Sequence, residues 1–129
     1  MVTLNWANNK NEISNGSGVQ LNGTKGINLD GGLNPKELLE GAVALCLSIT
    51  LEKVLERDKI TVDLNELEIH VEASKTAGTE NRFSHFHVDV KFPDGLEEKY
   101  RKKLLKVIER GCTISNTLQG EVTVELQEK

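Results

Sequence analysis

Alternation of apolar and polar residues predicts two short strands in the N-terminal region, residues 1–33. The first is indicated by three apolar residues at every second position, Val2, Leu4 and Trp6. The second falls on residues 19–21. Residues 15–18 (Asn-Gly-Ser-Gly) and the Asn22-Gly23 pair have turn chemistry, so we expect a short hairpin region here.

A second group of strands is predicted in the middle of the chain, and one more near its end. The apolar residues of the first are Leu64, Leu67, Ile69 and Val71, and those of the second are Phe86, Val88, Val90 and Phe92. Residues 76–81 form the loop between them. Each strand has one polar face, as is typical of antiparallel sheets. Alternation over residues 122–126 predicts a last strand.

The first helix is predicted by its N-terminal residues and by a long apolar stretch. Asn34 can cap the helix, Pro35 suits the first helical position, and Glu37 is placed for a capping box. Residues 42–51 are almost all apolar, and a helix that is apolar on every side must be covered on every side. A chain this small has too few other elements to cover the helix on every side, so we infer that another subunit covers part of the helix. The charged residues 52–59 should reach solvent.

A second helix is predicted to start near Asp94, with Glu97 as a possible capping partner, and to end at Gly111. Cys112 then follows the helix directly. The fold class is therefore α+β, with an antiparallel sheet and a long central helix. A chain of 129 residues suits one domain, residues 1–129.

Charge and composition narrow the classes of function. The net charge of −4, from 20 acidic and 16 basic residues, gives no electrostatic reason to expect a nucleic acid or an anionic membrane as partner. No apolar run approaches the roughly 20 residues that cross a bilayer. The first ten residues lack the features of a signal peptide. We therefore expect a cytoplasmic protein, whose thiols stay reduced.

The three histidines are weak candidates for a metal site. His70, His85 and His87 all fall on the polar strand faces, where paired strands could bring them together. Since the sequence signals no further ligand, exposed histidines are the preferred interpretation, and we expect neither a metal nor a cofactor.

The two cysteines are the stronger candidates for chemistry. Taken separately, Cys46 on the apolar helix and Cys112 after a helix end would each more often be structural. Together they are the minimum for a peroxidase cycle, in which one thiolate becomes a sulfenic acid and a second thiol closes a disulfide.

Two motifs resemble the signatures of the OsmC/Ohr family (osmotically inducible and organic hydroperoxide resistance proteins). The first is Asn34-Pro35-Lys36-Glu37-Leu38-Leu39, followed by Gly41-Ala42 and then Cys46. The second is Cys112-Thr113-Ile114-Ser115-Asn116-Thr117-Leu118. The order of helix, two strands, helix and strand also matches the family.

The resemblance implies an OsmC/Ohr-like fold in an intertwined homodimer, with residues 1–33 contributing to the dimer. It implies a stress-response antioxidant enzyme in which Cys46 is the peroxidatic cysteine, attacking an organic hydroperoxide, and Cys112 the resolving cysteine. A dithiol reductant of the dihydrolipoamide type would restore the enzyme.

The sequence departs from the family pattern around the thiols. Family members carry a glutamate directly after the motif proline, which holds an N-terminal arginine against the thiolate. Here Lys36 takes that position, Glu37 comes one residue late, and no arginine precedes Arg57. Thr113 replaces the usual proline after the second cysteine. We therefore keep Lys36 and Glu37 as supporting site candidates.

These departures leave a second hypothesis open, an OsmC-like small-molecule binding protein with weak or no peroxidase activity. Lys36 would then bind the head group of an anionic amphiphile, and the apolar helix would hold its tail.

Overall fold

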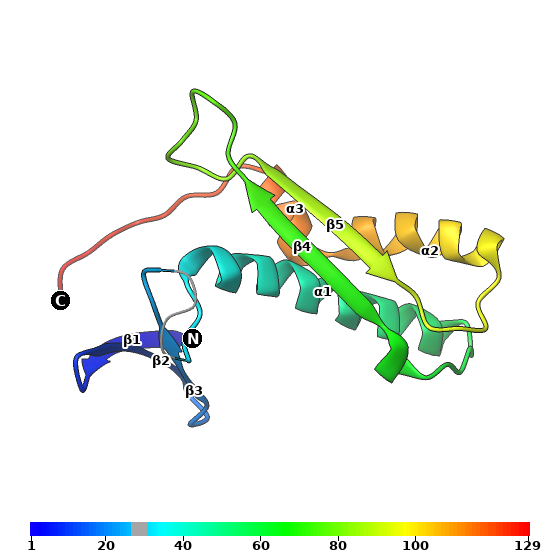
Figure 1. Cartoon of the computed structure of the whole chain (residues 1–129), viewed down its shortest axis with the longest axis horizontal. Coiled ribbons are helices and arrows are strands. Elements are labelled where there is room, and N and C mark those ends of the chain that lie inside the picture. Colours follow the sequence, from blue (N-terminus) through cyan, green and yellow to red (C-terminus); the bar gives the residue numbers. More distant parts are fainter. Residues whose placement is uncertain (27–30) are drawn as a thin grey trace. The chain divides into compact units, whose positions relative to one another are not determined.

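The computed structural model describes residues 1–26 and 31–129, which form two compact units, Met1–Gly41 and Ala42–Lys129. The elements follow one another as β1 (Val2–Ala7), β2 (Lys10–Asn15), β3 (Gln20–Gly23), α1 (Pro35–Arg57), the short 3-10 helix η1 (Leu64–Glu66), β4 (Glu68–Ser74), β5 (His85–Lys91), α2 (Glu98–Gly111) and α3 (Thr113–Gln119). Helix α1 begins in the first unit and continues into the second (Figure 1). The α+β class is confirmed.

The first unit contains a three-stranded antiparallel sheet in the order β1-β2-β3. Asn8 and Asn9 join β1 to β2 with φ values of 52° and 61°, a left-handed conformation that asparagine tolerates in tight hairpin turns. The turn predicted at residues 15–18 is confirmed, because the Asn15 side chain accepts hydrogen bonds from the N–H groups of Ser17 at 2.9 Å and Val19 at 3.1 Å. The turn predicted at residues 22–23 is wrong, since both lie within β3.

One face of this sheet is apolar, and most of its side chains are exposed. Leu4 pairs with Ile13, and Ile13 pairs with Leu21, so all three side chains share a face. Alternation along β1 adds Val2 and Trp6 to it. Val2, Leu4 and Trp6 keep 66%, 52% and 70% of their surface exposed.

The start of α1 has the predicted capping box. The Glu37 N–H donates to Asn34 Oδ1 at 2.8 Å, and the Asn34 N–H donates to Glu37 Oε1 at 2.9 Å. These reciprocal bonds satisfy backbone groups that a helix end otherwise leaves unpaired. The prediction from residues 34–37 is confirmed.

The second unit packs α1, α2 and the β4–β5 hairpin around one core. Antiparallel pairing sets Ile69 against Val90, Val71 against Val88, and Ala73 against Phe86. These apolar side chains share the inner face of the hairpin, which lies against the two helices (Figure 1). The buried core consists of Val43, Leu47, Leu51, Val54, Leu55, Leu96, Leu104, Ile108 and Cys112.

Helix α1 buries one side and leaves the other apolar side open. Leu45 and Ile49, four positions apart, are 62% and 43% exposed. The polar residues of its last turns, such as Glu52 and Lys53, are exposed as predicted. Helix α1 ends at Arg57, and Lys59 beyond it adopts a left-handed conformation with φ 55°, which lets the N–H of Ile60 bond to the Leu55 carbonyl.

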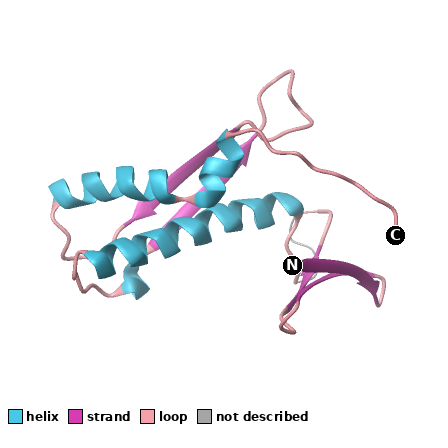
Figure 2. Ribbon diagram, turned by 180° about the vertical axis from the view of Figure 1, so that it is seen from behind, coloured by secondary structure: helices cyan, strands magenta, loops and turns pink. Residues whose placement is uncertain are grey.

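Three element predictions need correction. Helix α2 begins at Glu98 rather than near Asp94, because Gly95 at φ 94° cannot continue a right-handed helix. Leu64 lies in η1, and β4 starts only at Glu68. The strand predicted at residues 122–126 is wrong: these residues form an exposed loop (Figure 2).

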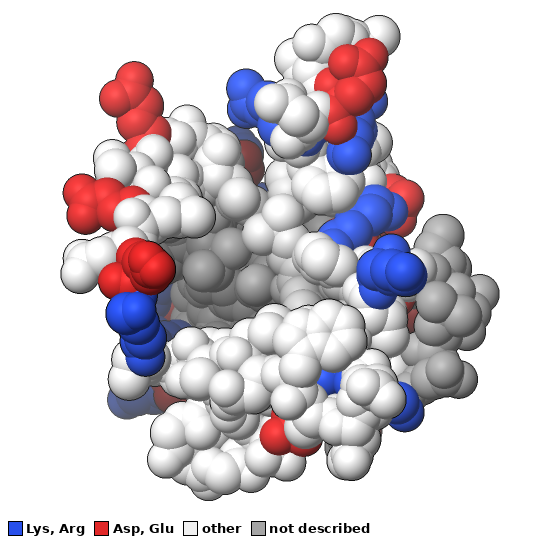
Figure 3. All heavy atoms as spheres, turned by 90° about the vertical axis from the view of Figure 1, so that its left-hand side faces the viewer, with Lys and Arg blue, Asp and Glu red and all other residues white. Residues whose placement is uncertain are grey.

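The surface carries both signs of charge. Figure 3 shows Lys and Arg side chains and Asp and Glu side chains on the same face, and neither sign covers it. Among the helices of the described residues, none is long and apolar enough to cross a membrane.

Candidate functional site

The C-terminal end of α2 lies close to α1, and a glycine permits this approach. A Cβ atom added to Gly111 would stand 3.0 Å from Thr50 Cγ2 on α1, closer than nearly all ordinary contacts. Thr50 is one turn beyond Cys46, and Cys112 follows Gly111. The absent side chain at Gly111 therefore lets the two cysteine-bearing segments meet.

Cys112 joins two helices and is fully buried, with 0% of its surface exposed. It follows the last residue of α2 and is also the N-terminal cap of α3. Its Sγ accepts a hydrogen bond from the Ser115 N–H at 3.4 Å, as the side chain of a capping residue does.

Cys46 is half-buried on α1, and groups at the start of α3 lower the pKa of its thiol. The backbone N–H of Ile114 lowers the pKa of the Cys46 thiol most, and burial opposes this effect. The Cys112 side chain, the N–H of Thr113 and the Thr50 side chain lower that pKa further. The Thr50 hydroxyl also donates to the Cys46 carbonyl at 2.8 Å, which fixes the Thr50 side chain beside the thiol.

The structure thus brings together the two cysteines that the sequence singled out. Both are free thiols, and the Cys112 side chain lies near enough to the Cys46 thiol to lower its pKa. A lower pKa raises the fraction of a thiol present as thiolate, and the thiolate is the nucleophile. A second thiol in contact with it can close a disulfide once the first is oxidised.

Cys46 lines an open groove of about 380 Å³. The walls are mostly apolar, with Leu45 and Ile49 from α1 and Ile114 from α3. Lys53 also lines the groove and is the one charged residue among its described lining residues. The groove can therefore accept an apolar molecule and bring it to the thiol.

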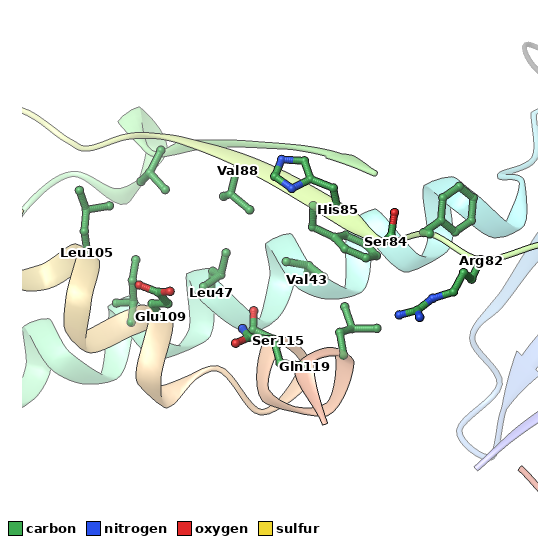
Figure 4. A pocket seen from close by; sticks show the side chains of 15 residues that line it. Val43, Leu47, Arg82, Ser84, His85, Val88, Leu105, Glu109, Ser115 and Gln119 are labelled. Carbon is green, nitrogen blue, oxygen red and sulfur yellow. The ribbon is translucent and has the colours of Figure 1, made fainter. Parts of the chain in front are cut away.

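A larger groove of about 420 Å³ lies on the other side of α1. Arg82, Ser84 and His85 mark one end of it, and Leu105 and Glu109 mark the other (Figure 4). Its described lining residues include no cysteine. We favour the smaller groove as the site because Cys46 lines it. The larger groove exceeds it only slightly in volume.

The two supporting candidates lie in the first unit. The Lys36 ammonium forms an ion pair with Glu40 at 3.3 Å, and Glu37 completes the capping box with Asn34. A role for either residue at Cys46 stays a prediction.

The three histidines are exposed, as preferred from the sequence, and His85 also lines the larger groove. His70 lies 2.7 Å from Glu68, and His87 lies 3.2 Å from Asp89. In the described part of the chain, no three His, Cys, Asp or Glu side chains are close enough together to hold a metal ion.

Sequence reasoning missed three groups that lower the pKa of the Cys46 thiol, the N–H groups of Thr113 and Ile114 and the side chain of Thr50, and it missed Lys53 as a lining residue of the groove. The two side chains could have been found, because Thr50 and Lys53 follow Cys46 by four and seven positions on a predicted helix and so share its face. The N–H groups carry no comparable signal, since nearly every residue type has one.

Comparison with known proteins agrees with this architecture. The model of the OsmC-like protein family matches residues 28–127. The chain is 30% identical over 135 residues to the Bacillus subtilis (strain 168) uncharacterized protein YmaD, covering 98% of this chain and 90% of that one.

Solved structures show the same fold at lower identity. The OsmC-like protein of Mycoplasma pneumoniae matches with a TM-score of 0.73 and 19% identity, covering 93% of this chain and 86% of that one. The organic hydroperoxide resistance protein OhrB of Bacillus subtilis matches with a TM-score of 0.63 and 23% identity, covering 100% and 96%. From the family match and this fold, we conclude that the chain belongs to the OsmC-like protein family.

Proposed function

We propose that this protein is a thiol-dependent peroxidase that reduces organic hydroperoxides through a two-cysteine cycle. One observation carries the proposal: Cys46, whose thiol has a lowered pKa, lines a mostly apolar groove, and the Cys112 side chain lies near enough to contribute to that lowering. Solved structures of organic hydroperoxide resistance proteins have the same fold and support the substrate class.

In the first step the Cys46 thiolate attacks the terminal oxygen of the hydroperoxide. A sulfur–oxygen bond forms as the oxygen–oxygen bond breaks, which leaves a sulfenic acid and an alkoxide that takes up a proton to become the alcohol. The N–H groups of Ile114 and Thr113 favour the thiolate that starts this step.

In the second step the Cys112 sulfur attacks the Cys46 sulfenic acid. A disulfide forms and the sulfenic oxygen leaves as water. An external dithiol, such as one of the dihydrolipoamide type, then reduces the disulfide and is itself oxidised to a cyclic disulfide. No metal or cofactor is needed for either step.

Burial supports the division of roles between the thiols. A peroxidatic cysteine must meet its substrate, and Cys46 lines the groove. A resolving cysteine needs to reach only the first sulfur, and Cys112 is fully buried beside it.

The proposal includes a cytoplasmic homodimer built from one OsmC-like domain per chain. The exposed apolar side chains of β1, Val2, Leu4 and Trp6, support it, because a second copy would remove them from water. The binding-protein hypothesis has less support, since the Lys36 ammonium that it requires is paired with Glu40.

The test is oxidation of the reduced protein by cumene hydroperoxide near neutral pH, with free thiols counted and products mapped by mass spectrometry. We expect rapid loss of both thiols to a Cys46–Cys112 disulfide. Cys46→Ser should abolish peroxide consumption, whereas Cys112→Ser should consume about one equivalent and accumulate a sulfenic acid that dimedone traps. Undiminished consumption by Cys46→Ser would contradict the proposal.

A further inference from the structure

The groove at Cys46 has one charged residue among its described lining residues. Lys53 lies there with apolar and small neutral residues. A cation on an otherwise apolar wall attracts a negative charge more strongly than the same cation in bulk water, because the wall lowers the local dielectric constant.

Helix geometry sets the position of Lys53 relative to the thiol. Cys46 and Lys53 are seven positions apart on α1, which puts them on the same face and about 10 Å apart along the axis. Ile49 and Thr50 lie between them on that face and line the same groove. A ligand that reaches both residues must therefore have an apolar part between two polar ends.

The Lys53 ammonium is not engaged elsewhere in the described part of the chain. No carboxylate there lies within ion-pair distance of it, whereas Lys36 pairs with Glu40 and Lys102 with Glu98. The groups that stabilise the Cys46 thiolate are N–H, hydroxyl and thiol donors, and Lys53 is not among them. Its charge is therefore available to a molecule in the groove.

We infer that Lys53 is a specificity-determining residue, which makes the Cys46 site select hydroperoxides that carry an anionic group over neutral ones. This inference rests on the proposed peroxidase function. The carboxylate of the substrate lies at Lys53, its hydrocarbon part lies on Ile49 and its neighbours, and the peroxide reaches the Cys46 sulfur. Lysine serves this role because a flexible ammonium binds a carboxylate as a point charge.

The first measurement needs no peroxidase activity. Cys46 is alkylated in parallel by iodoacetate, which is anionic, and by iodoacetamide, which is neutral, at low ionic strength. Lys53→Gln should lower the iodoacetate-to-iodoacetamide rate ratio about two- to five-fold, as expected for a unit charge some 6–10 Å away in a partly screened site. The effect should shrink in about 0.5 M salt, where the screening length is only a few ångströms.

Lys106→Gln is the matched control. Lys106 is an exposed lysine on α2 that lines neither groove. Replacing it by glutamine changes the net charge by the same amount as Lys53→Gln does. The control should leave the alkylation ratio within about 1.5-fold of the wild type. The inference would be overturned if the alkylation ratio fell equally in both variants, or if it did not fall in Lys53→Gln.

The second measurement compares substrates. Linoleic acid hydroperoxide carries a carboxylate and cumene hydroperoxide does not, so the ratio of their kcat/KM values measures the selectivity. Lys53→Gln should lower this ratio about five-fold, whereas an unchanged ratio overturns the inference even if Cys46→Ser is inactive. If the wild type reduces neither peroxide, the proposed function fails, and the alkylation ratio still decides whether Lys53 selects anions.

Discussion

At the scale of single residues, Thr113 is the most informative departure from the family signature. The usual proline at this position has no N–H group, whereas the Thr113 N–H is one of the donors that lower the pKa of the Cys46 thiol. The threonine therefore adds a donor at a site that lacks the family's N-terminal arginine.

Replacing Thr113 by proline should remove this donor with little other change. Proline suits the first helical position, which Thr113 occupies in α3. We expect the pKa of the Cys46 thiol to rise and its alkylation by iodoacetamide at pH 7 to slow about two- to five-fold, in line with the loss of one partly exposed hydrogen bond to a charged group. The pH dependence of alkylation measures both effects.

Thr113→Ala is the control for this prediction, because alanine keeps the N–H group and removes only the side chain. Its alkylation profile should overlay that of the wild type. If alanine and proline slow the reaction equally, the threonine side chain and not the N–H is responsible.

The residues of the site were only partly predictable. Cys46 and Cys112 could be chosen from the sequence because thiols are chemically distinctive and the flanking motifs are specific. Their contact could not, since it depends on how closely the end of α2 approaches α1 at Gly111. Local pattern carries no information on that distance.

At the scale of the elements, one side-chain bond joins the end of α1 to the start of α2. The Tyr100 hydroxyl donates to Asp58 Oδ2 at 2.6 Å. Burial raises the pKa of Tyr100 to about 12, with Asp58 adding to the rise. The hydrogen bond from Tyr100 lowers the pKa of Asp58, and Arg57 lowers it further.

Removing this bond by Tyr100→Phe should lower the Tm by about 3–5 °C at pH 7. The folded pKa of Tyr100 lies above its unfolded value of about 10, so its contribution to stability is complete below pH 10 and is lost as the pH rises towards about 12. For Asp58, the folded pKa is the lower one, so its contribution is present at neutral pH and lost in acid. The difference in Tm between variant and wild type should therefore narrow above pH 10.

Spectroscopic titration gives an independent check, because Tyr100 is the one tyrosine of the sequence. Its absorbance change in the folded protein should have a midpoint near pH 12. A midpoint at the ordinary value near pH 10 would contradict the assigned bond.

Elements were predictable where local chemistry determines them. The capping box at Asn34 and the alternation in β5 needed no tertiary information. Strand β2 was missed because it has only one large apolar residue, Ile13, and so shows no alternation. It is held in place by hydrogen bonding to β1 on one side and β3 on the other. Helix α3 was missed because its seven residues offer only Ile114 and Leu118 at helical spacing.

At the scale of the whole molecule, the exposed apolar face of β1 predicts the assembly. We expect the wild type to sediment as a dimer, at twice the chain mass of 14.3 kDa. Leu4→Lys should shift it towards the monomer, because burying an unpaired ammonium in an apolar interface is strongly unfavourable. Sedimentation velocity measures both states.

Thr3→Lys is the matched control, since Thr3 is exposed on the opposite face of the same strand. It should remain dimeric. A monomeric wild type, or equal dissociation of both variants, would show that this face does not form the interface.

The position of Cys112 has a consequence for how related sequences should be read. One atom, its sulfur, is both the proposed redox partner of Cys46 and the cap of α3, so selection on chemistry and selection on folding act on the same residue. Cys46 caps no helix and is under no such second constraint. In a lineage that abandoned the redox cycle, position 46 is free to drift among small apolar residues, whereas position 112 should retain a small hydrogen-bond acceptor such as serine or threonine. A small apolar residue at position 46 together with serine or threonine at position 112 would then mark a relative that lost the redox cycle but kept the fold.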